Sequence, residues 1–184
     1  MREGWTYKKL GDYIKEYSVK NKAGKDIPVY SVTNSQGFCK EYFSKEIASQ
    51  DKTSYKIVPY GFFAFNPSRI NVGSIARLIT FNAGIVSPMY ICFRTKKDVL
   101  PEYLEYFFST KNFSLEIDKR LEGSVRMCLS FEGLCSISIP IPSHNNQIKI
   151  INRLASINNK LNNEEQIYNR LLLQKQFLLN QLFI

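Results

Sequence analysis

The chain has 184 residues, of which 44% are hydrophobic, and a formal charge of +9. This composition excludes a disordered polymer, and the length allows one globular domain with an appendage. No apolar run approaches the ~20 residues that span a bilayer, and the first residues lack the apolar region of a signal peptide. We therefore expect a cytoplasmic protein that has no contact with a membrane.

Basic side chains are in excess along most of the sequence. Residues 1–142 carry 20 basic and 14 acidic side chains, and residues 143–184 carry five and two. A polyanion such as nucleic acid is a natural partner, because basic groups release counterions from phosphates. Charge that serves solubility alone is the alternative.

Metal ligands and catalytic groups are scarce. Cys39, Cys92, Cys128 and Cys135 form no C-x-x-C pair, and His144 is the only histidine. A zinc site needs about four nitrogen or sulfur ligands at short spacings. We expect no metal, free thiols in a reducing compartment, and no catalytic residue, because phosphate loops and nucleophile–base pairs are also missing.

Residues 1–142 alternate between short strand-like segments and turns, which is typical of mixed α and β structure. β-Branched and aromatic residues predict the strands, and Gly, Asn and Pro predict the turns. Pro101, followed by Glu102, predicts the start of a helix. We expect strands at 27–33, 55–65 with an interruption at 59–61, 75–80, 87–93 and 136–141, turns at 34–37 and 82–84, and a helix from 100–102 whose core face includes Tyr103, Leu104, Phe107 and Phe108.

Residues 143–184 contain neither Gly nor Pro and have helical periodicity. Ser143 is the expected N-cap, and the helix would span roughly 60 Å. A stripe of that length needs a second helix to cover it, although folding back on its own domain is the alternative. The apolar seam positions are Ile150, Leu154, Ile157, Leu161, Tyr168, Leu171, Leu178 and Leu182, while Glu164 and Lys175 interrupt the stripe and are expected to fix its register or to pair across an antiparallel partner.

Short motifs are spread over nearly the whole chain. They are Glu3-Gly4-Trp5 with Leu10-Gly11-Asp12; Asn-Pro-Ser-Arg-Ile-Asn-Val-Gly-Ser-Ile at 66–75 with Gly-Ile-Val-Ser-Pro-Met-Tyr at 84–90; Gly-Ser-Val-Arg at 123–126 with Leu129, Leu134 and residues 137–142; and Gln147-Ile148, Ile151, Leu154 and residues 174–183. In this order they resemble the specificity subunit of type I restriction–modification systems, in a half-length form. The chain departs from that pattern at Asn146, where Glu usually stands, and in length, since full subunits carry two recognition domains and two helices.

The resemblance implies a non-catalytic α+β protein. A target-recognition domain at 1–142 would read double-stranded DNA, and a long helix at 143–184 would mediate dimerisation and dock modification subunits. These partners, and not this chain, would bind S-adenosylmethionine and methylate adenine, and a restriction subunit is a further expected partner. Two copies that pair their helices antiparallel would form a homodimer and read a split palindrome.

Side-chain chemistry suggests where DNA is contacted. Asn and Gln suit adenine edges, whereas Arg and Lys suit guanine or phosphates. We expect base contacts from the turn after the first predicted strand and phosphate contacts from the basic loop before it. For each residue a solvated surface role is the alternative, and Arg69 and Arg126 are alternatively residues that hold loops in place. The predicted DNA-binding residues are Lys20, Lys22, Lys25, Asn34, Ser35, Gln36, Lys40, Arg69, Asn71, Ser74, Arg77, Lys119, Arg120, Ser124 and Arg126.

Two other functions remain open from the sequence. A coiled-coil adaptor without sequence-specific DNA binding would explain the long helix but not the basic domain. An RNA-binding module would explain the charge and the aromatic residues, and a preference for single-stranded RNA over duplex would favour it. An enzyme has the least support.

Overall fold

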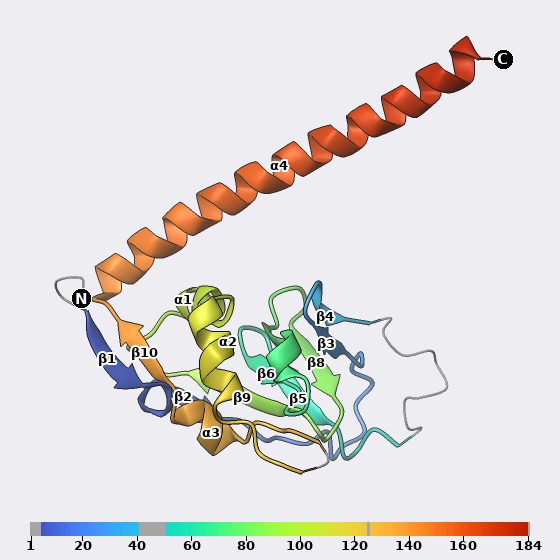
Figure 1. Cartoon of the computed structure of the whole chain (residues 1–184). Helices are drawn as coiled ribbons and strands as arrows, with labels where there is room; N and C mark the ends of the chain where they lie inside the picture. Colours follow the sequence, from blue (N-terminus) through green and yellow to red (C-terminus); the bar gives the residue numbers. More distant parts are fainter. Residues whose placement is uncertain (1–4, 41–50, 125, 184) are drawn as a thin grey trace. The chain divides into compact units, whose positions relative to one another are not determined.

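The structure is a computed structural model that describes residues 5–40, 51–124 and 126–183. The chain divides into two compact units, Met1–His144 and Asn145–Ile184. The first unit mixes strands and helices, and the second is a single helix (Figure 1). The expected α+β class is confirmed. Glu3, Gly4 and Val125, which belong to the sequence motifs, lie outside the described residues.

A four-stranded antiparallel sheet forms the centre of the first unit. Its strands lie in the order β2 (Ile14–Glu16), β9 (Ile91–Thr95), β6 (Phe63–Phe65) and β7 (Ile75–Arg77). β6 is fully buried, as expected of a strand covered on both faces. The other strands of the described residues form three antiparallel pairs: β1 (Thr6–Lys9) with β10 (Ser138–Ile141), β3 (Ser31–Thr33) with β4 (Gly37–Cys39), and β5 (Lys56–Pro59) with β8 (Ala83–Val86).

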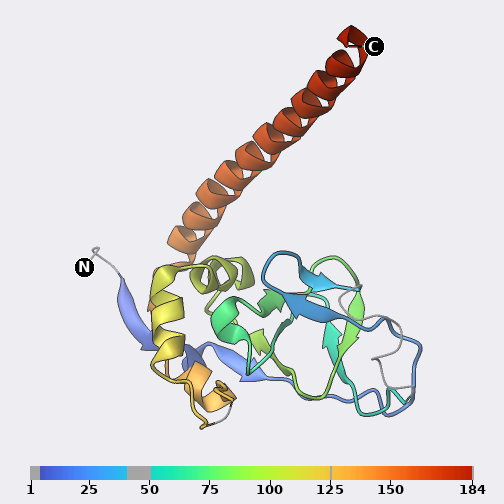
Figure 2. The same ribbon diagram turned by 45° about the vertical axis from the view of Figure 1, so that its right-hand side comes forward.

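Phenylalanine rings join the sheet to two short helices, α1 (Pro101–Phe108) and α2 (Lys111–Asp118). The rings of Phe63 and Phe93 stack with centroids 5.0 Å apart, and Phe108 meets Phe63 edge-on at 5.6 Å. Phe113 of α2 continues the cluster at 4.8 Å from Phe108. Figure 2 shows α1, α2 and α3 (Phe131–Cys135) toward one side of the domain and the β3–β4 and β5–β8 pairs toward the other.

Side-chain caps explain why α2 and α3, which the sequence patterns do not predict, begin where they do. The Thr110 hydroxyl accepts a hydrogen bond from the Phe113 N–H at 3.2 Å, and the Ser130 hydroxyl accepts one from the Gly133 N–H at 3.0 Å. Both helices are too short for a clear period. Tertiary packing through buried side chains such as Phe113 therefore stabilises them.

The strand predicted at 87–93 was wrong over its first half. Residues 87–90 form a turn, in which the Tyr90 N–H donates to the Ser87 carbonyl at 3.1 Å, and only Ile91–Thr95 is a strand. Pro88 has no N–H to donate to a ladder, which opposes a strand here. The turn predicted at 82–84 was also misplaced, because Ala83 and Gly84 belong to β8.

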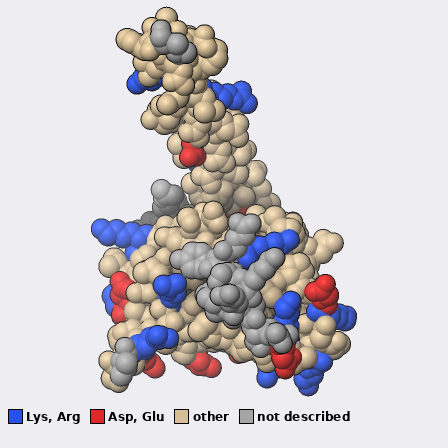
Figure 3. Space-filling model, turned by 90° about the vertical axis from the view of Figure 1, so that its right-hand side faces the viewer, with Lys and Arg blue, Asp and Glu red and all other residues tan. Residues whose placement is uncertain are grey.

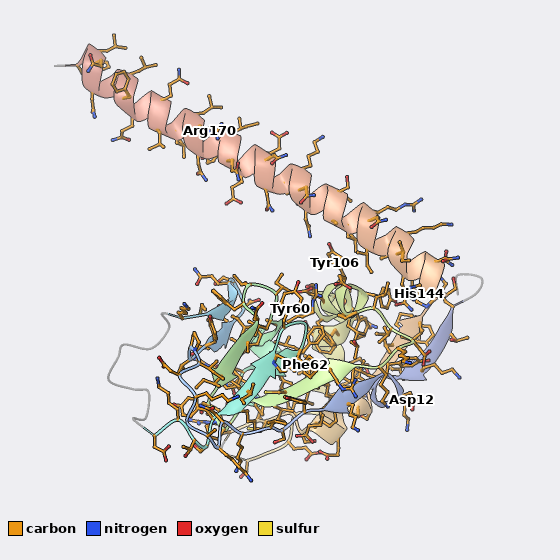
Figure 4. All side chains as sticks on the ribbon, turned by 180° about the vertical axis from the view of Figure 1, so that it is seen from behind. Asp12, Tyr60, Phe62, Tyr106, His144 and Arg170 are labelled. Carbon is orange, nitrogen blue, oxygen red and sulfur yellow. The ribbon has the colours of Figure 1, made fainter. Side chains whose placement is uncertain are left out.

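α4 spans His144–Leu182 with 39 residues, confirms the predicted long helix, and from Asn145 onward forms the second unit. Every side chain from Ser156 to Phe183 is exposed. Figure 4 shows side chains that project all round α4, with Arg170 labelled along its length. Within the described residues, no helix combines the length and the hydropathy that a membrane crossing requires.

Candidate nucleic-acid interface

The β3–β4 hairpin presents three consecutive polar side chains. Residues 34–36 connect the strands, and Thr33 pairs with Gly37 at the end of the ladder. Gly37 has a φ of +61°, and the Gln36 N–H donates to the Thr33 hydroxyl at 3.2 Å. A three-residue loop followed by a left-handed glycine is a common hairpin connection. The sequence-predicted base-reading residues Asn34, Ser35 and Gln36 are therefore exposed at the tip of an ordered hairpin.

The motif at residues 66–75, called here the central motif, folds into a closed loop, the central loop, beside this hairpin. The Asn66 N–H donates to the Ser74 carbonyl at 3.0 Å, and the Ser74 N–H donates to the Arg69 carbonyl at 3.1 Å. Between them lies the 3₁₀ helix η2 (Ile70–Val72), followed by Gly73 with a φ of +88°. A Cβ atom at Gly73 would overlap the side chain of Asn34. The fold thus brings together two separate groups of predicted residues, the hairpin tip and the central motif.

Residues of both the hairpin and the loop line two open hollows. Their volumes are about 550 Å³ and about 410 Å³, and Thr33, Asn34 and Val72 line both of them. Asn71 adds an amide to the larger hollow, and Arg69 adds a guanidinium to the smaller. This surface combines groups that hydrogen-bond base edges or phosphates with an exposed apolar residue, since 59% of Val72 is accessible.

Ser74, predicted as a DNA contact, lies inside this surface and not on it. Its side chain is buried, with 4% exposure, and its hydroxyl donates to the Val32 carbonyl at 2.7 Å. The neighbouring Tyr90 is equally buried and accepts the Val32 N–H at 3.2 Å. Tyr90 belongs to the motif at 84–90, but the sequence predicts no contact for it, because a tyrosine in an apolar run carries no signal of this hydrogen bond.

Arg77 is held within the protein by two carboxylates. Its guanidinium lies 2.6 Å from Glu102 and 3.0 Å from Glu105 of α1, and its side chain is 11% exposed. A guanidinium with both forks engaged has little capacity left for a phosphate. The ion pairs fasten β7 to α1.

Lys119 and Arg120 both bind Glu116, at 2.6 and 2.7 Å. Hydrogen bonds from Lys119 and Arg120 hold the pKa of the Glu116 carboxyl below its usual value. Arg120 also donates to the Ser136 hydroxyl at 2.7 Å. These contacts secure the end of α2 and the loop after it, where the predicted residues Ser124 and Arg126 are exposed.

The predicted basic loop before β3 is ordered around Asn21. Asn21 is 1% exposed, and its side chain accepts from the Lys25 N–H at 3.0 Å and donates to the Lys25 carbonyl at 2.9 Å. Lys20, Lys22 and Lys25 are all exposed around this buried amide. The loop therefore presents three ammonium groups from a fixed backbone.

Positive charge is dispersed over one face of the first unit (Figure 3). Figure 3 shows Lys and Arg side chains spread over one face of the domain, with Asp and Glu among them. Lys40 lies beyond the hairpin, with its Nζ 4.9 Å from the centre of the Phe81 ring, a cation–π contact that leaves the residue exposed. On this face the described basic side chains stand apart from one another (Figure 3), an arrangement that suits isolated phosphate contacts.

The described residues contain no group of three or more His, Cys, Asp or Glu side chains that would hold a metal ion. Cys92 is fully buried, and its burial raises the pKa of the thiol to about 12.

Comparison with known proteins identifies the family. A sequence profile described as "Type I restriction modification DNA specificity domain" matches residues 2–173. The chain belongs to this family. The match covers the first unit and most of α4, so both parts belong to one specificity domain.

Solved structures share the fold of this specificity domain. The HsdS subunit from Thermoanaerobacter tengcongensis aligns with a TM-score of 0.67 and 15% identity over 91% of this chain and 45% of that one. A structure described as the structural basis of complex assembly and conformational transition of the type I R-M system aligns with a TM-score of 0.58 and 17% identity, over 87% of this chain and 40% of that one. The type I S subunit from M. genitalium aligns with a TM-score of 0.54 and 14% identity, over 86% of this chain and 40% of that one. This chain therefore spans less than half the length of each, and no curated protein matches its sequence.

The helix of the specificity domain exposes apolar side chains on more than one face. On the predicted seam, Leu171 and Leu178 are 57% and 47% exposed, and they line a shallow hollow of about 410 Å³ together with Lys175. Leu173 and Phe177, which helical periodicity places on the opposite face, are 72% and 61% exposed. A helix that is apolar on opposite faces is expected to be covered on both.

Proposed function

We propose that this specificity domain is the DNA-recognition subunit of a type I restriction–modification complex and performs no catalysis itself. The observation that carries the proposal is the family profile, which runs through the hairpin, the central motif and most of α4. In this proposal S-adenosylmethionine binds to the modification subunit, and this chain decides where on double-stranded DNA that subunit acts. A restriction subunit is a further partner.

The hairpin tip and the central loop are the proposed base-reading surface. Asn34, Gln36 and Asn71 carry the amides that suit adenine edges, and Val72 suits contact with the methyl group of thymine. Lys20, Lys22 and Lys25 are proposed to hold phosphates, a role that fixes position without reading sequence. The internal contacts of Ser74, Arg77, Lys119 and Arg120 favour structural roles for these four residues.

A second copy of the chain is the proposed partner of the α4 seam. The exposed stripe would be covered by an identical helix that runs antiparallel, which gives a two-fold symmetric dimer and a two-fold symmetric target. One register fits the charges. If Glu164 lies opposite Lys175, the same register places Leu161 opposite Leu178 and Ile157 opposite Leu182. A shift by one heptad instead places Lys175 opposite Ile157. The charge pair therefore selects the register.

Selection from random DNA tests the recognition role. The full chain, co-purified with the modification subunit of its own system, would be used to capture duplexes from a random-sequence pool. We expect enrichment of a motif with two read halves separated by unread bases. A variant with Asn34, Ser35 and Gln36 replaced by Ala should lose the enriched motif yet still retain DNA. Capture without enrichment of any motif would refute the proposal, and displacement by single-stranded RNA but not by duplex would favour the RNA-binding alternative.

A further inference from the structure

The backbone of Val32, at the centre of β3, is held by two side-chain hydroxyls. Val32 is 5% exposed. Its N–H donates to the Tyr90 hydroxyl at 3.2 Å, and its carbonyl accepts from the Ser74 hydroxyl at 2.7 Å. Both hydrogen bonds are buried. Tyr90 and Ser74 therefore bind β3 in the place where a further strand would otherwise continue the ladder.

The two hydroxyls belong to residues that are themselves fixed. The Tyr90 carbonyl accepts from the Lys56 ammonium at 2.7 Å, and the ring lies in the apolar cluster that also contains Val32. Ser74 closes the central loop through its own backbone, as the donor to Arg69 and the acceptor from Asn66. A hydrogen bond to a group locked in this way restrains its partner more than one to a mobile side chain does.

The restraint continues from Val32 to the tip of the hairpin. Thr33 follows Val32 directly, and its hydroxyl accepts the Gln36 N–H. The Asn34 side chain packs against Gly73, which precedes Ser74 in the chain. Gly73 has no Cβ atom, and this leaves the space that the Asn34 side chain occupies. The backbone is thus fixed up to the loop, while the side chains of residues 34–36 remain exposed.

We propose that Ser74 and Tyr90 are positioning residues for sequence reading by the β3–β4 hairpin. This inference rests on the proposed function, in which the hairpin tip contacts bases. Without these two hydrogen bonds the hairpin would be more mobile and would have to become ordered each time it contacts bases. The free-energy cost of this ordering lowers affinity for the target. Binding to unrelated DNA depends on phosphate contacts and escapes the cost. The two hydroxyls therefore act on discrimination between sequences more than on DNA affinity as such.

The test compares Tyr90→Phe and Ser74→Ala with the matched control Tyr103→Phe. Tyr103 is also buried, and its hydroxyl donates to the Pro140 carbonyl of β10 at 2.6 Å, away from the hairpin. Each full-length variant, in complex with the modification subunit, would be titrated with a duplex that carries the selected motif and with one whose half-sites are scrambled. Amide hydrogen exchange of residues 32–37 would be measured on the same samples.

We expect Tyr90→Phe and Ser74→Ala each to lower the ratio of the two affinities about fivefold, the factor that corresponds to one net hydrogen bond. Affinity for the scrambled duplex should stay within about twofold, and exchange at residues 32–37 should accelerate. The control Tyr103→Phe should change neither the ratio of the two affinities nor the exchange at residues 32–37. An equal loss on both duplexes would instead indicate general destabilisation and would overturn the inference.

The proposed function and the positioning role of Ser74 and Tyr90 can be refuted separately. A wild-type complex that prefers no duplex refutes the proposed function, and the reading role of the hairpin falls with it. A wild-type complex that does prefer its target, with variants that keep both the full ratio and slow exchange, leaves the proposed function intact and refutes the role of Ser74 and Tyr90 alone.

Discussion

A charge exchange within α4 tests the proposed antiparallel dimer and its register together. In that register Glu164 of one copy faces Lys175 of the other, and two-fold symmetry makes the pair occur twice. Glu164→Lys alone would place lysine opposite lysine at both positions, and Lys175→Glu alone would place glutamate opposite glutamate. The double variant Glu164→Lys with Lys175→Glu would restore two opposite-charge pairs in reversed order.

The expected loss in free energy of dimerisation follows from the exposure and the number of these charge pairs. Residues 164 and 175 are exposed on the single helix and would lie at the partly hydrated seam of a dimer, so an attractive pair contributes about 0.5–1 kcal/mol. Reversal from attraction to repulsion therefore costs about 1–2 kcal/mol per pair, or about 2–4 kcal/mol per dimer. The dissociation constant of each single variant should rise about 30-fold to 1000-fold, and that of the double variant should return to within about tenfold of wild type.

Sedimentation velocity over a range of concentrations, at low and at high salt, measures these constants. High salt should narrow the difference between single variants and wild type, because it screens exposed charges. In a parallel dimer residue 164 would face residue 164 of the other copy, and residue 175 would face residue 175. Like charges would then face each other in the wild type and in the single variants alike. Single variants that dimerise as well as wild type, or a double variant no better than either, would therefore refute the register.

Further predictions concern other parts of the chain. Gly73→Ala should destabilise the first unit and disturb the hairpin tip, because its φ is +88° and its Cβ would overlap a neighbouring side chain; a melting temperature equal to wild type would contradict this. Replacement of Leu173 and Phe177 by Ala should leave the dimer intact but weaken co-purification with the modification subunit, which we propose covers that face; weakened dimerisation would show instead that this face belongs to the seam. Burial raises the pKa of the Cys92 thiol to about 12, so iodoacetamide at pH 8 should modify it slowly in the folded chain and rapidly in denaturant, and equal rates would be inconsistent with its burial. Burial, followed by the charge of a nearby tyrosine, raises the pKa of Tyr103 to about 12, above its ordinary value of 10.0. The folded state therefore retains this proton more tightly, and the stability that it contributes below pH 10 is lost as the pH rises toward about 12. Tyr103→Phe should flatten that part of a plot of unfolding free energy against pH, and an unchanged slope would contradict the assignment.

The features that the sequence predicts correctly are those encoded locally. The long helix follows from a run without Gly or Pro and with a sustained apolar period, and the hairpin turn follows from Asn34, Ser35, Gln36 and Gly37. Short elements are less legible. α3 has only five residues, and its start depends on the Ser130 cap. Residues 87–90 form a turn, but apolar residues there favour a strand prediction despite Pro88.

The candidate site depends on contacts between distant parts of the chain. The contact between Asn34 and Gly73 joins segments that are far apart in the sequence, and no local sequence pattern predicts it. A serine such as Ser74 in a polar motif resembles a DNA contact until its burial is known, and Arg77 resembles a phosphate ligand until two glutamates of α1 are placed beside it. Residue type suggested the chemistry, but only the fold showed which side chains are free to use it.

A map of methylated bases is the most direct test of the central proposal. The full chain would be co-expressed with its cognate modification subunit in a host without methylation of its own, and methylated adenines would be located by long-read sequencing. We predict a split palindrome, with two inverted half-sites separated by unread bases. A split asymmetric motif would contradict the homodimer while leaving recognition in place. No new methylation, with both proteins folded and co-purifying, would contradict the recognition role itself.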